Sequence, residues 1–305
     1  MQKSNLQELP VAIIGSGPVG LAAAAHLVKR NIPFLLFEAG TGIAANVKSW
    51  EHVQVFSPWE YNTDATAVEL LERNGWQSPN PKALPTGKEL IEGYLQPLGE
   101  LPSIAPHIRL EHRVIAVNRK NLDKLKTRNR DKQPFVVQTL HRGKRQRFEV
   151  RAVIDASGTW QSQNPVGSGG IFAEGEGENH ANIFYGIPNI LEEGTKRYAN
   201  KNILVVGSGH SAAQVLFNLS ELTDSYPNTH IHWVIRKRNV RSVIGSKDKD
   251  QLPARGAIGK RLEKLIQRKT LHLHTGFHLH QIESQKKDSW SSLGFKMNKN
   301  QSLKE

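Results

Sequence analysis

The sequence predicts an α/β fold with two domains, each built on a parallel sheet, and three observations lead to it. The apolar segment VAII at 11–14 runs into the glycine-rich turn GSGPVG. The apolar segment NILVV at 202–206 runs into a second such turn, GSGHSA. A chain of 305 residues, 38% of them hydrophobic, has enough material for two cores. Together these observations predict two Rossmann-like dinucleotide-binding domains whose parallel sheets are joined by β-hairpin or meander crossovers.

The first turn has the order of elements that a dinucleotide site requires. The strand at 11–14 is followed by Gly15, Gly17 and Gly20 and then by the helix formers LAAAAHLVKR at 21–30. We expect Gly15 to permit the sharp turn, Gly17 to let the main chain approach a pyrophosphate, and Gly20 to let helix and strand pack closely. The positive end of the helix would then face the phosphates.

A carboxylate follows the next predicted strand. The segment IPFLLFEAG at 32–40 is apolar up to Glu38, close to the roughly 20-residue offset at which a carboxylate accepts hydrogen bonds from ribose hydroxyls. A carboxylate there suits FAD or NAD and repels a 2′-phosphate, and the spacing leaves both cofactors open. The competing interpretation is an accidental glycine cluster with a solvated Glu38.

A family resemblance separates FAD from NAD at this turn. The segment GSGPVG, with Pro18 after the second glycine, and the later LFEAG resemble the FAD-binding entry of the two-dinucleotide flavoproteins. This pyridine nucleotide oxidoreductase superfamily includes flavin-containing monooxygenases, thioredoxin reductases and glutathione reductases. The resemblance implies that the first turn binds FAD.

The second turn repeats this plan but reverses the charge that follows it. Ala212 replaces the third glycine, where only a small side chain is needed, and Arg236 stands where the first domain has Glu38. Because a guanidinium can pair with a 2′-phosphate, we predict NADPH rather than NADH here; the alternative is that the cations only cap a strand end. The residues expected at this cofactor are Gly207, Gly209, His210, Ser211, Ala212 and Arg236.

The segment between the turns indicates where the domains divide. AVIDASG at 152–158 resembles the closing strand of FAD domains in these flavoproteins, which implies that Asp155 and Gly158 lie at the cofactor. The predicted organisation is an FAD-binding domain over 1–165, a connecting segment over 166–200 and an inserted NAD(P)H-binding domain over 201–305.

An internal repeat supports one plan for both domains. Segments 107–120 and 270–284 share a pattern of a short β-hairpin, a polar turn and another strand. The second contains His272, His274, His278 and His280, whose imidazoles at alternate strand positions raise the alternative of a metal site. Since no cysteine is present and carboxylates are sparse nearby, we predict solvated strand histidines and no metal.

The absence of cysteine restricts the electron acceptor. It excludes the redox-active cysteine pair of the disulfide reductases, which leaves oxygen as the leading acceptor for a reduced flavin. Segments 47–65 and 84–98 resemble the region of flavin-containing monooxygenases where loops approach the flavin ring. The candidates for lining that cavity are Trp50, Pro58, Trp59 and Asn62, and the alternative is that they plug the core under a loop.

No catalytic residue is assigned from the sequence. The N-hydroxylating and Baeyer–Villiger families carry an F-x-G-x-x-x-H motif before the second turn. The segment IFAEGEGENHANIFYG at 171–186 only approximates it, with Glu174 where the glycine should be. A catalytic role for His180 is therefore not inferred.

The charge of the chain does not require a nucleic-acid partner. The formal net charge is +13, and basic clusters lie at 124–132, 141–147 and 235–241. The first two flank the apolar run FVVQTL, as a solvated hairpin would, and no aromatic residues are interleaved for base stacking. No segment has the length and apolarity of a signal peptide or membrane span. We expect a cytoplasmic protein with a small-molecule substrate, no nucleic-acid or membrane partner, and a homodimeric or partner-subunit assembly.

These features predict an FAD-dependent, NADPH-using oxidoreductase of monooxygenase type that passes electrons to oxygen and a small nucleophilic substrate. The alternatives are an NADPH:acceptor reductase serving a quinone or carrier, and a non-catalytic dinucleotide-binding fragment. The resemblance also implies a return from the NADP domain into the FAD domain, and 289–305 contains no counterpart of the first closing strand. We therefore expect a C-terminally shortened member that retains FAD poorly unless a partner subunit completes the cavity.

Overall fold

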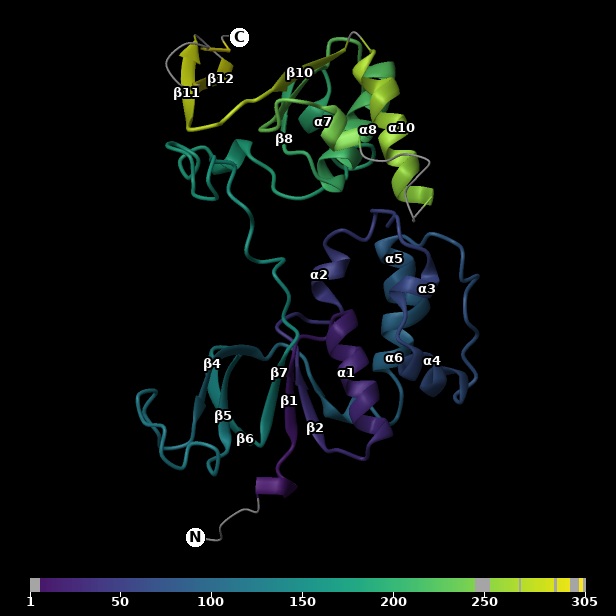
Figure 1. Ribbon diagram of the computed structural model, residues 1–305, viewed down its shortest axis with the longest axis vertical. Coiled ribbons are helices and arrows are strands. Elements are labelled where there is room, and N and C mark those ends of the chain that lie inside the picture. Colours follow the sequence, from purple (N-terminus) through teal and green to yellow (C-terminus); the bar gives the residue numbers. More distant parts are fainter. Residues whose placement is uncertain (1–5, 245–252, 269, 288–289, 297–301, 304–305) are drawn as a thin grey trace. The chain divides into compact units, whose positions relative to one another are not determined.

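The chain divides into two compact units, Met1–Gln161 and Ser162–Glu305 (Figure 1). The computed structural model describes residues 6–244, 253–268, 270–287, 290–296 and 302–303. Each unit contains a parallel sheet with helices, so the predicted α/β class with two Rossmann-like domains is confirmed. The expected connecting segment, 166–200, falls within the second unit. The predicted NAD(P)H-binding domain ends in a segment of which residues 297–301 and 304–305 lie outside the described residues.

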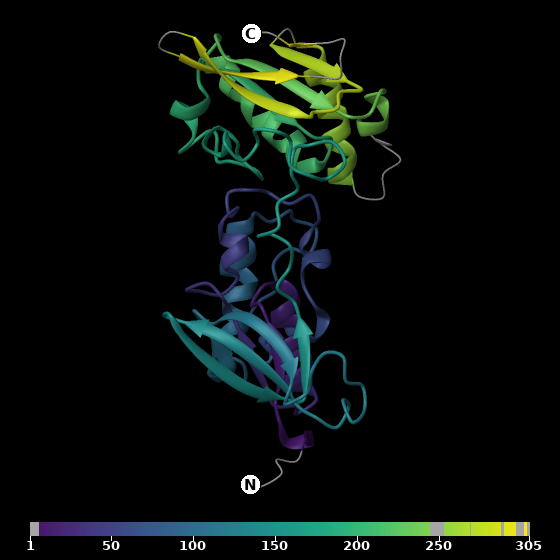
Figure 2. The ribbon, with the colours of Figure 1, turned by 90° about the vertical axis from the view of Figure 1, so that its left-hand side faces the viewer.

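The first unit has a four-stranded parallel sheet in the order β3-β2-β1-β7. Figure 1 shows helices on one side of this sheet and an antiparallel meander on the other, and Figure 2 shows the meander facing the viewer. The sheet strands are β1 Val11–Ile14, β2 Phe34–Phe37, β3 Ile108–Arg109 and β7 Ala152–Asp155, and the meander strands are β4 Arg113–Arg119, β5 Phe135–His141 and β6 Lys144–Val150.

Both faces of this sheet are covered, which explains why β1 and β2 are apolar without interruption. Ile13 and Leu36 pack with Leu21 of the first helix, whereas Ala12 and Phe37 pack with the meander. The helices of this unit are α1 Pro18–Lys29, α2 Ala45–Lys48, α3 Trp59–Asn62, α4 Ala65–Glu72, α5 Gly87–Leu90, a π-helical segment Ile91–Leu95 and α6 Gln96–Gly99, with 3-10 helices at Leu6–Glu8 and Ala105–His107.

The basic hairpin predicted around 141–147 is confirmed. β5 and β6 pair antiparallel up to His141 opposite Lys144, and the two residues between them, Arg142 and Gly143, have φ values of 47° and 78°. Positive φ at both central residues matches the right-handed twist of the strands. The basic side chains of this segment are exposed at Arg142, Lys144, Arg145 and Arg147.

The second unit has a three-stranded sheet in the order β10-β9-β8, again parallel. Trp233 on one face packs with α8 and α10, whereas Val234 on the opposite face packs with Phe277 and Leu279. The elements are α7 Thr195–Tyr198, β8 Asn202–Val206, α8 His210–Ser225, β9 His230–Ile235, α9 Arg241–Ile244, α10 Pro253–Ile266, β10 Leu271–Thr275, β11 Gln281–Lys287, β12 Trp290–Lys296, β13 Ser302–Leu303 and a 3-10 helix His180–Asn182. The last three strands form an antiparallel sheet.

The internal repeat is present, but the hairpins predicted at 107–120 and 270–284 are wrong. In each segment the first strand joins the parallel sheet, with β3 beside β2 and β10 beside β9, and the next strand begins an antiparallel sheet. The main-chain groups of β3 and β10 form hydrogen bonds with the neighbouring strand of the parallel sheet. Leu271 of β10 is also buried there among apolar side chains. This combination outcompetes a local hairpin.

The strand histidines consequently lie in a parallel sheet. His272 and His274 of β10 stack beside His232 of β9, with ring centroids 4.9 and 5.5 Å from its ring, and His272 is exposed. His278 and His280 are exposed in the loop before β11. Within the described ranges, no group of three or more histidine, cysteine or acidic side chains is placed to hold a metal ion.

No helix in the described part of the chain has the length and apolarity needed to cross a membrane.

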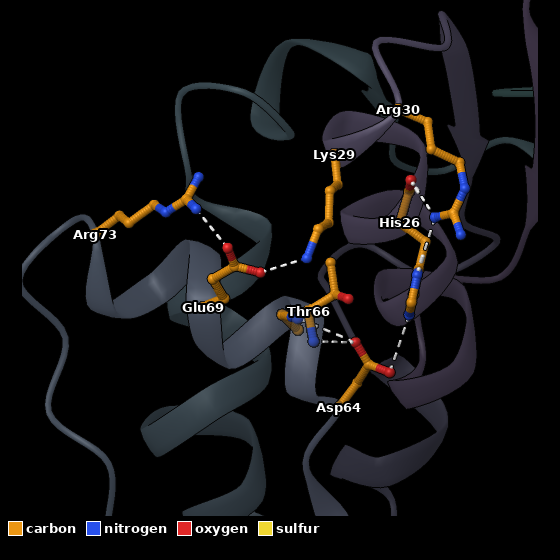
Figure 3. A network of polar contacts seen from close by, with 8 residues as sticks. His26, Lys29, Arg30, Asp64, Thr66, Glu69 and Arg73 are labelled. Carbon is orange, nitrogen blue, oxygen red and sulfur yellow. Dashed lines mark hydrogen bonds and ion pairs between the residues drawn. The ribbon is translucent and has the colours of Figure 1, made fainter.

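A polar network joins α1 to α4 on the surface of the first unit (Figure 3). Asp64 caps α4 by accepting the N–H groups of Thr66 and Ala67, both at 3.0 Å, and it pairs with His26 Nε2 at 3.2 Å. Burial opposes ionisation of Asp64, but the hydrogen bond from Ala67 and the neighbouring His26 hold the pKa of this carboxyl below its ordinary value. Glu69 bonds Lys29 at 2.6 Å and also Arg73.

Removing this cap is expected to destabilise the first unit in a pH-dependent way. Asp64→Ala should lower the free energy of unfolding by about 0.5–2 kcal/mol at pH 7, as for other lost N-caps. Because the folded pKa of Asp64 lies below the unfolded value near 3.8, its charge stabilises the fold above that pH. The stabilisation is lost as the pH falls through the folded pKa.

The matched control is Asp64→Asn, which keeps a capping side chain without the charge. Urea denaturation at pH 7 and about pH 3 measures both variants. The stability difference between wild type and Asp64→Asn should shrink at the lower pH, and an equal difference at both pH values would contradict the role of the charge.

Candidate functional site

The first glycine-rich turn connects β1 to α1 and has the tight geometry that the spacing predicts. Gly15 has φ +96°, and a Cβ there would lie 2.7 Å from the carbonyl oxygen of Ala156. A Cβ at Gly20 would lie 1.9 Å from the carbonyl oxygen of Gly15. The predicted roles of Gly15 in the turn and Gly20 in packing are therefore confirmed.

Gly17 differs from its two neighbours in the motif. Its φ of −75° and ψ of −174° are extended values that any residue can adopt, and among the described residues no atom lies within 4 Å of where a Cβ would be. The fold of the chain thus gives no reason for glycine at this position. A ligand that must approach the main chain closely does give one, as the pyrophosphate of a dinucleotide would.

The start of α1 is suited to an anion. Gly17 is the N-cap and provides no side-chain hydrogen bond, and Pro18 occupies the first turn of the helix. Val19 in this turn is 68% exposed. The first N–H groups of a helix have no partner within the helix, so they can bind a phosphate at this exposed end.

Glu38 is a buried, hydrogen-bonded carboxylate beside this turn. It directly follows β2, is only 9% exposed, and accepts three hydrogen bonds. Oε2 accepts the main-chain N–H of Ser16 at 2.9 Å and the Ser16 hydroxyl at 2.7 Å, and Oε1 accepts the N–H of Gly40 at 2.7 Å. The carboxylate is therefore fixed in the position where the sequence predicts a ribose acceptor.

The closing strand β7 places the other predicted FAD-binding residues next to the turn. Asp155 is paired with Ile14 at the end of β1, and the N–H of Ala156 bonds the carbonyl oxygen of Ile14 at 2.9 Å. The Ser157 hydroxyl and N–H donate to Asp155 and hold the pKa of its carboxyl below the ordinary value. Gly158 follows with φ +69° and open space beside it. Residues far apart in sequence thus meet at one edge of the sheet.

The four candidates for a flavin cavity have different surroundings. Trp59 is 7% exposed in the core of the first unit, and a Cβ at Gly93 would lie 3.4 Å from its ring. The Asn62 amide donates to the carbonyl oxygens of Ser57 and Pro58, at 2.7 and 2.9 Å. These contacts favour the packing alternative for Trp59 and a loop-bracing role for Asn62.

The remaining two candidates are more accessible. Trp50 is half-buried, with its ring centroid 6.5 Å from that of Trp160, which is 41% exposed. Pro58 is half-buried as the N-cap of α3. Trp50 therefore stays the stronger prediction for a ring near the cofactor.

The second turn, between β8 and α8, repeats the backbone conformation of the first but is less tightly packed. Gly207 has φ +129°, and a Cβ there would lie 3.8 Å from the side chain of Ala212. Gly209 is an N-cap without a side-chain bond and has extended φ and ψ of −86° and 175°. A Cβ at Gly209 would again have no atom within 4 Å in the part of the chain that the structure describes. His210 and Ser211 are exposed in the first turn of α8.

Arg236 lies immediately after β9, the position that corresponds to Glu38 after β2. Its side chain is exposed, and no partner for its guanidinium is found within the described ranges. The next cation, Lys237, donates instead to the carbonyl oxygen of Ser242 at 3.1 Å. Arg236 is thus exposed and available to a ligand phosphate within the part of the chain that the structure describes.

Three structurally important residues were not singled out from the sequence. Ser16 braces Glu38, and Trp233 donates its indole N–H to the carbonyl oxygen of Gly207 at 2.7 Å, which anchors the second turn. Glu176 is 1% exposed and accepts hydrogen bonds from Val166, Ala173 and Tyr185. A serine between motif glycines and a tryptophan within a strand are weak signals, because their partners are distant in sequence.

His180, to which the sequence assigns no catalytic role, lies exposed in a short 3-10 helix.

Comparison with known proteins agrees with this geometry. The family model described as "Pyridine nucleotide-disulphide oxidoreductase" matches residues 12–301, which include both turns. The chain belongs to this family. It is therefore an FAD/NAD(P)-binding flavoprotein oxidoreductase. The family's name refers to disulfide chemistry, but this sequence contains no cysteine. Any disulfide step here would therefore proceed without a thiol of this chain.

Solved structures share the fold of this family member at low sequence identity. The bacillithiol disulfide reductase of Bacillus cereus has 19% identity and a TM-score of 0.64, over 97% of this chain and 74% of that one. The FAD-bound cadaverine monooxygenase DfoA of Erwinia amylovora has 13% identity and a TM-score of 0.65, over 94% and 73%. Thioredoxin reductase of Lactococcus lactis has 18% identity and a TM-score of 0.55, over 97% and 73%. No curated protein matches the chain.

Proposed function

We propose that this flavoprotein uses the first turn for FAD and the second for NADPH, and that it passes electrons from NADPH through the flavin to oxygen and a small nucleophilic substrate. The observation that carries the proposal is the matched pair of Gly17 and Gly209. Each is a glycine that the surrounding chain does not require, at the N-cap of a helix that follows a buried strand. Two such positions imply two dinucleotides.

The opposite charges that follow the two turns support the division between cofactors. Glu38 is buried and offers a carboxylate acceptor to the ribose, whereas Arg236 is exposed and offers donors to a 2′-phosphate. The Asp155 and Gly158 segment beside the first turn fits the FAD assignment. FAD supplies the redox chemistry when bound, and the residues of the chain bind it, orient it and exclude water.

Oxygen is the proposed terminal acceptor because the chain lacks a thiol of its own. In a monooxygenase reaction NADPH is oxidised by two electrons, one oxygen atom enters the substrate and the other leaves as water. Amines and thioethers are the proposed substrate classes because both are nucleophilic, and ketones are a third class to test. DfoA, one of the similar structures, is a cadaverine monooxygenase by its name, which supports an amine as substrate.

A reductase that delivers electrons to a quinone, a carrier or a soluble disulfide is the second candidate. The similar structures that are reductases favour it, and the sequence excludes only a protein cysteine pair as acceptor. A cytoplasmic setting and a homodimer or partner subunit complete the proposal in either case.

Turnover measurements separate these candidates. The purified chain with added FAD is assayed for NADPH oxidation and oxygen uptake with a panel of amines, thioethers and ketones. A monooxygenase should show NADPH oxidation stimulated by one substrate class, with oxygenated product equal to the NADPH consumed. Equal NADPH oxidation with every substrate, accompanied by peroxide release or by quinone or disulfide reduction, would contradict the monooxygenase and support the reductase. No flavin reduction by NADPH would contradict both.

A further inference from the structure

Ser16 lies between the first two motif glycines and is fully buried. A buried hydroxyl needs a hydrogen-bond partner, and this one has two. It donates to Glu38 Oε2 at 2.7 Å and accepts the main-chain N–H of Ala44 at 3.3 Å. The side chain therefore ties the glycine-rich turn both to the carboxylate after β2 and to the loop before α2.

The loop that Ser16 holds has an unusual conformation. Ala44 has φ 56° and ψ 36°, in the left-handed region, and its N–H also bonds the carbonyl oxygen of Ser16 at 3.2 Å. A left-handed alanine persists only where its surroundings enforce it. The two oxygens of Ser16 supply that constraint, so the segment between Glu38 and α2 is fixed against the turn.

Most of the hydrogen-bonding capacity of the Glu38 carboxylate is used within the protein. An ionised carboxylate can accept about four hydrogen bonds, two on each oxygen. Oε2 already accepts two from Ser16, through its N–H and its hydroxyl, and Oε1 accepts one from Gly40. One acceptor position therefore remains, and it is on Oε1.

We infer that Ser16 is a positioning residue that occupies Glu38 Oε2 and directs Oε1 toward a single ribose hydroxyl of the cofactor. This inference rests on the proposed binding of FAD at the first turn. The site recognises one ribose hydroxyl strongly and the other weakly, because only one acceptor position of Glu38 is open. Ser16 would set that preference without touching the ribose itself.

The protein holds the Glu38 carboxylate in its binding position before the cofactor arrives. With three donors in place, Glu38 does not have to lose rotamer freedom when the cofactor arrives, so its hydrogen bond contributes more to affinity. Loss of the Ser16 hydroxyl would leave Oε2 with one donor and open a second acceptor position. The carboxylate could then accept either hydroxyl, and the discrimination between them would fall.

A competition experiment on the full-length chain measures this preference. FAD is removed, its rebinding is followed by flavin fluorescence, and ADP, 2′-deoxy-ADP and 3′-deoxy-ADP are used as competitors. Competition with FAD restricts the measurement to the FAD site. In the wild type, loss of one hydroxyl should weaken competition on the order of tenfold or more, as for a lost hydrogen bond to a charged group. Loss of the other should weaken it less than about threefold.

The Ser16 variants should lose this asymmetry. In Ser16→Ala both deoxy analogues are expected to compete within about threefold of each other. Ser16→Cys keeps a filled side chain of the same shape, with a larger sulfur in place of oxygen, but offers only a weak donor. It should therefore behave like Ser16→Ala, and it separates lost hydrogen bonding from lost packing. Ser49→Ala is the matched control, because it removes a hydroxyl bonded at 2.7 Å to the carbonyl oxygen of Asn46 and leaves Glu38 untouched. It should retain the wild-type asymmetry.

The possible outcomes are distinguishable. Equal competition by the two deoxy analogues in the wild type, or an unchanged asymmetry in Ser16→Cys, would overturn the inference while leaving the FAD assignment intact. Failure of the wild-type chain to rebind FAD would instead contradict the proposed function and the inference with it. If Ser16→Ala does not fold, as judged by its thermal unfolding, Ser16→Cys alone decides the result.

Discussion

Gly17→Val is expected to yield a folded protein that has lost its FAD. The valine side chain would project into the open space beside the turn, where the pyrophosphate must approach the main chain. The backbone at this position is extended and no atom of the described residues lies within 4 Å of the new Cβ, so the fold itself should tolerate the change. We expect FAD affinity to fall by at least about 100-fold, which is about 2.7 kcal/mol. Flavin absorbance per chain and FAD titration of the purified variant measure the loss.

Gly209→Val provides a matched control in the second unit, because its glycine has the same extended backbone and the same open surroundings. This variant should keep its flavin and lose NADPH-dependent bleaching. Normal flavin content in Gly17→Val would show that the first turn does not hold FAD. Glu38→Ala, which removes the ribose acceptor, should also lower flavin content.

Arg236→Ala is expected to weaken NADPH binding selectively. Removing a charge-assisted hydrogen bond to a 2′-phosphate costs about 1.5–3 kcal/mol, so the dissociation constant for NADPH should rise roughly 10- to 150-fold. NADH lacks that phosphate and should lose less than about threefold. Arg236→Glu should repel the phosphate and reverse the preference toward NADH. Titration of each variant with both nucleotides measures the effect.

Lys237→Ala is the control for a general loss of positive charge. Its ammonium group already donates to the carbonyl oxygen of Ser242, so removing it should change NADPH binding by less than about threefold. Equal losses for NADPH and NADH in Arg236→Ala would remove the assignment of this arginine to the 2′-phosphate.

The sequence predicted correctly those features that depend on residues close together in the chain. Gly15 and Gly20 were predicted from spacing alone, and their contacts confirm that neither could carry a side chain without displacing the main chain. The basic hairpin at 141–147 was likewise predictable, because its turn chemistry is local. The hairpins predicted at 107–120 and 270–284 are wrong because a short apolar strand pairs with whichever partner buries it best. That partner is a strand distant in sequence.

The sequence by itself determined that the chain has two glycine-rich turns after buried strands and no cysteine for a disulfide step. It also determined that residues of opposite charge, Glu38 and Arg236, follow the second strand of each domain. These properties depend on residue type and spacing, which tertiary structure cannot alter. Only the tertiary structure decided that Trp59 is buried in a core, that Trp233 anchors the second turn, and that Ser16 occupies one oxygen of Glu38. The hydrogen bonds of Ser16 with Glu38 and of Trp233 with Gly207 join residues that are 22 and 26 positions apart. No local pattern in the sequence encodes which distant residues the folded chain brings together.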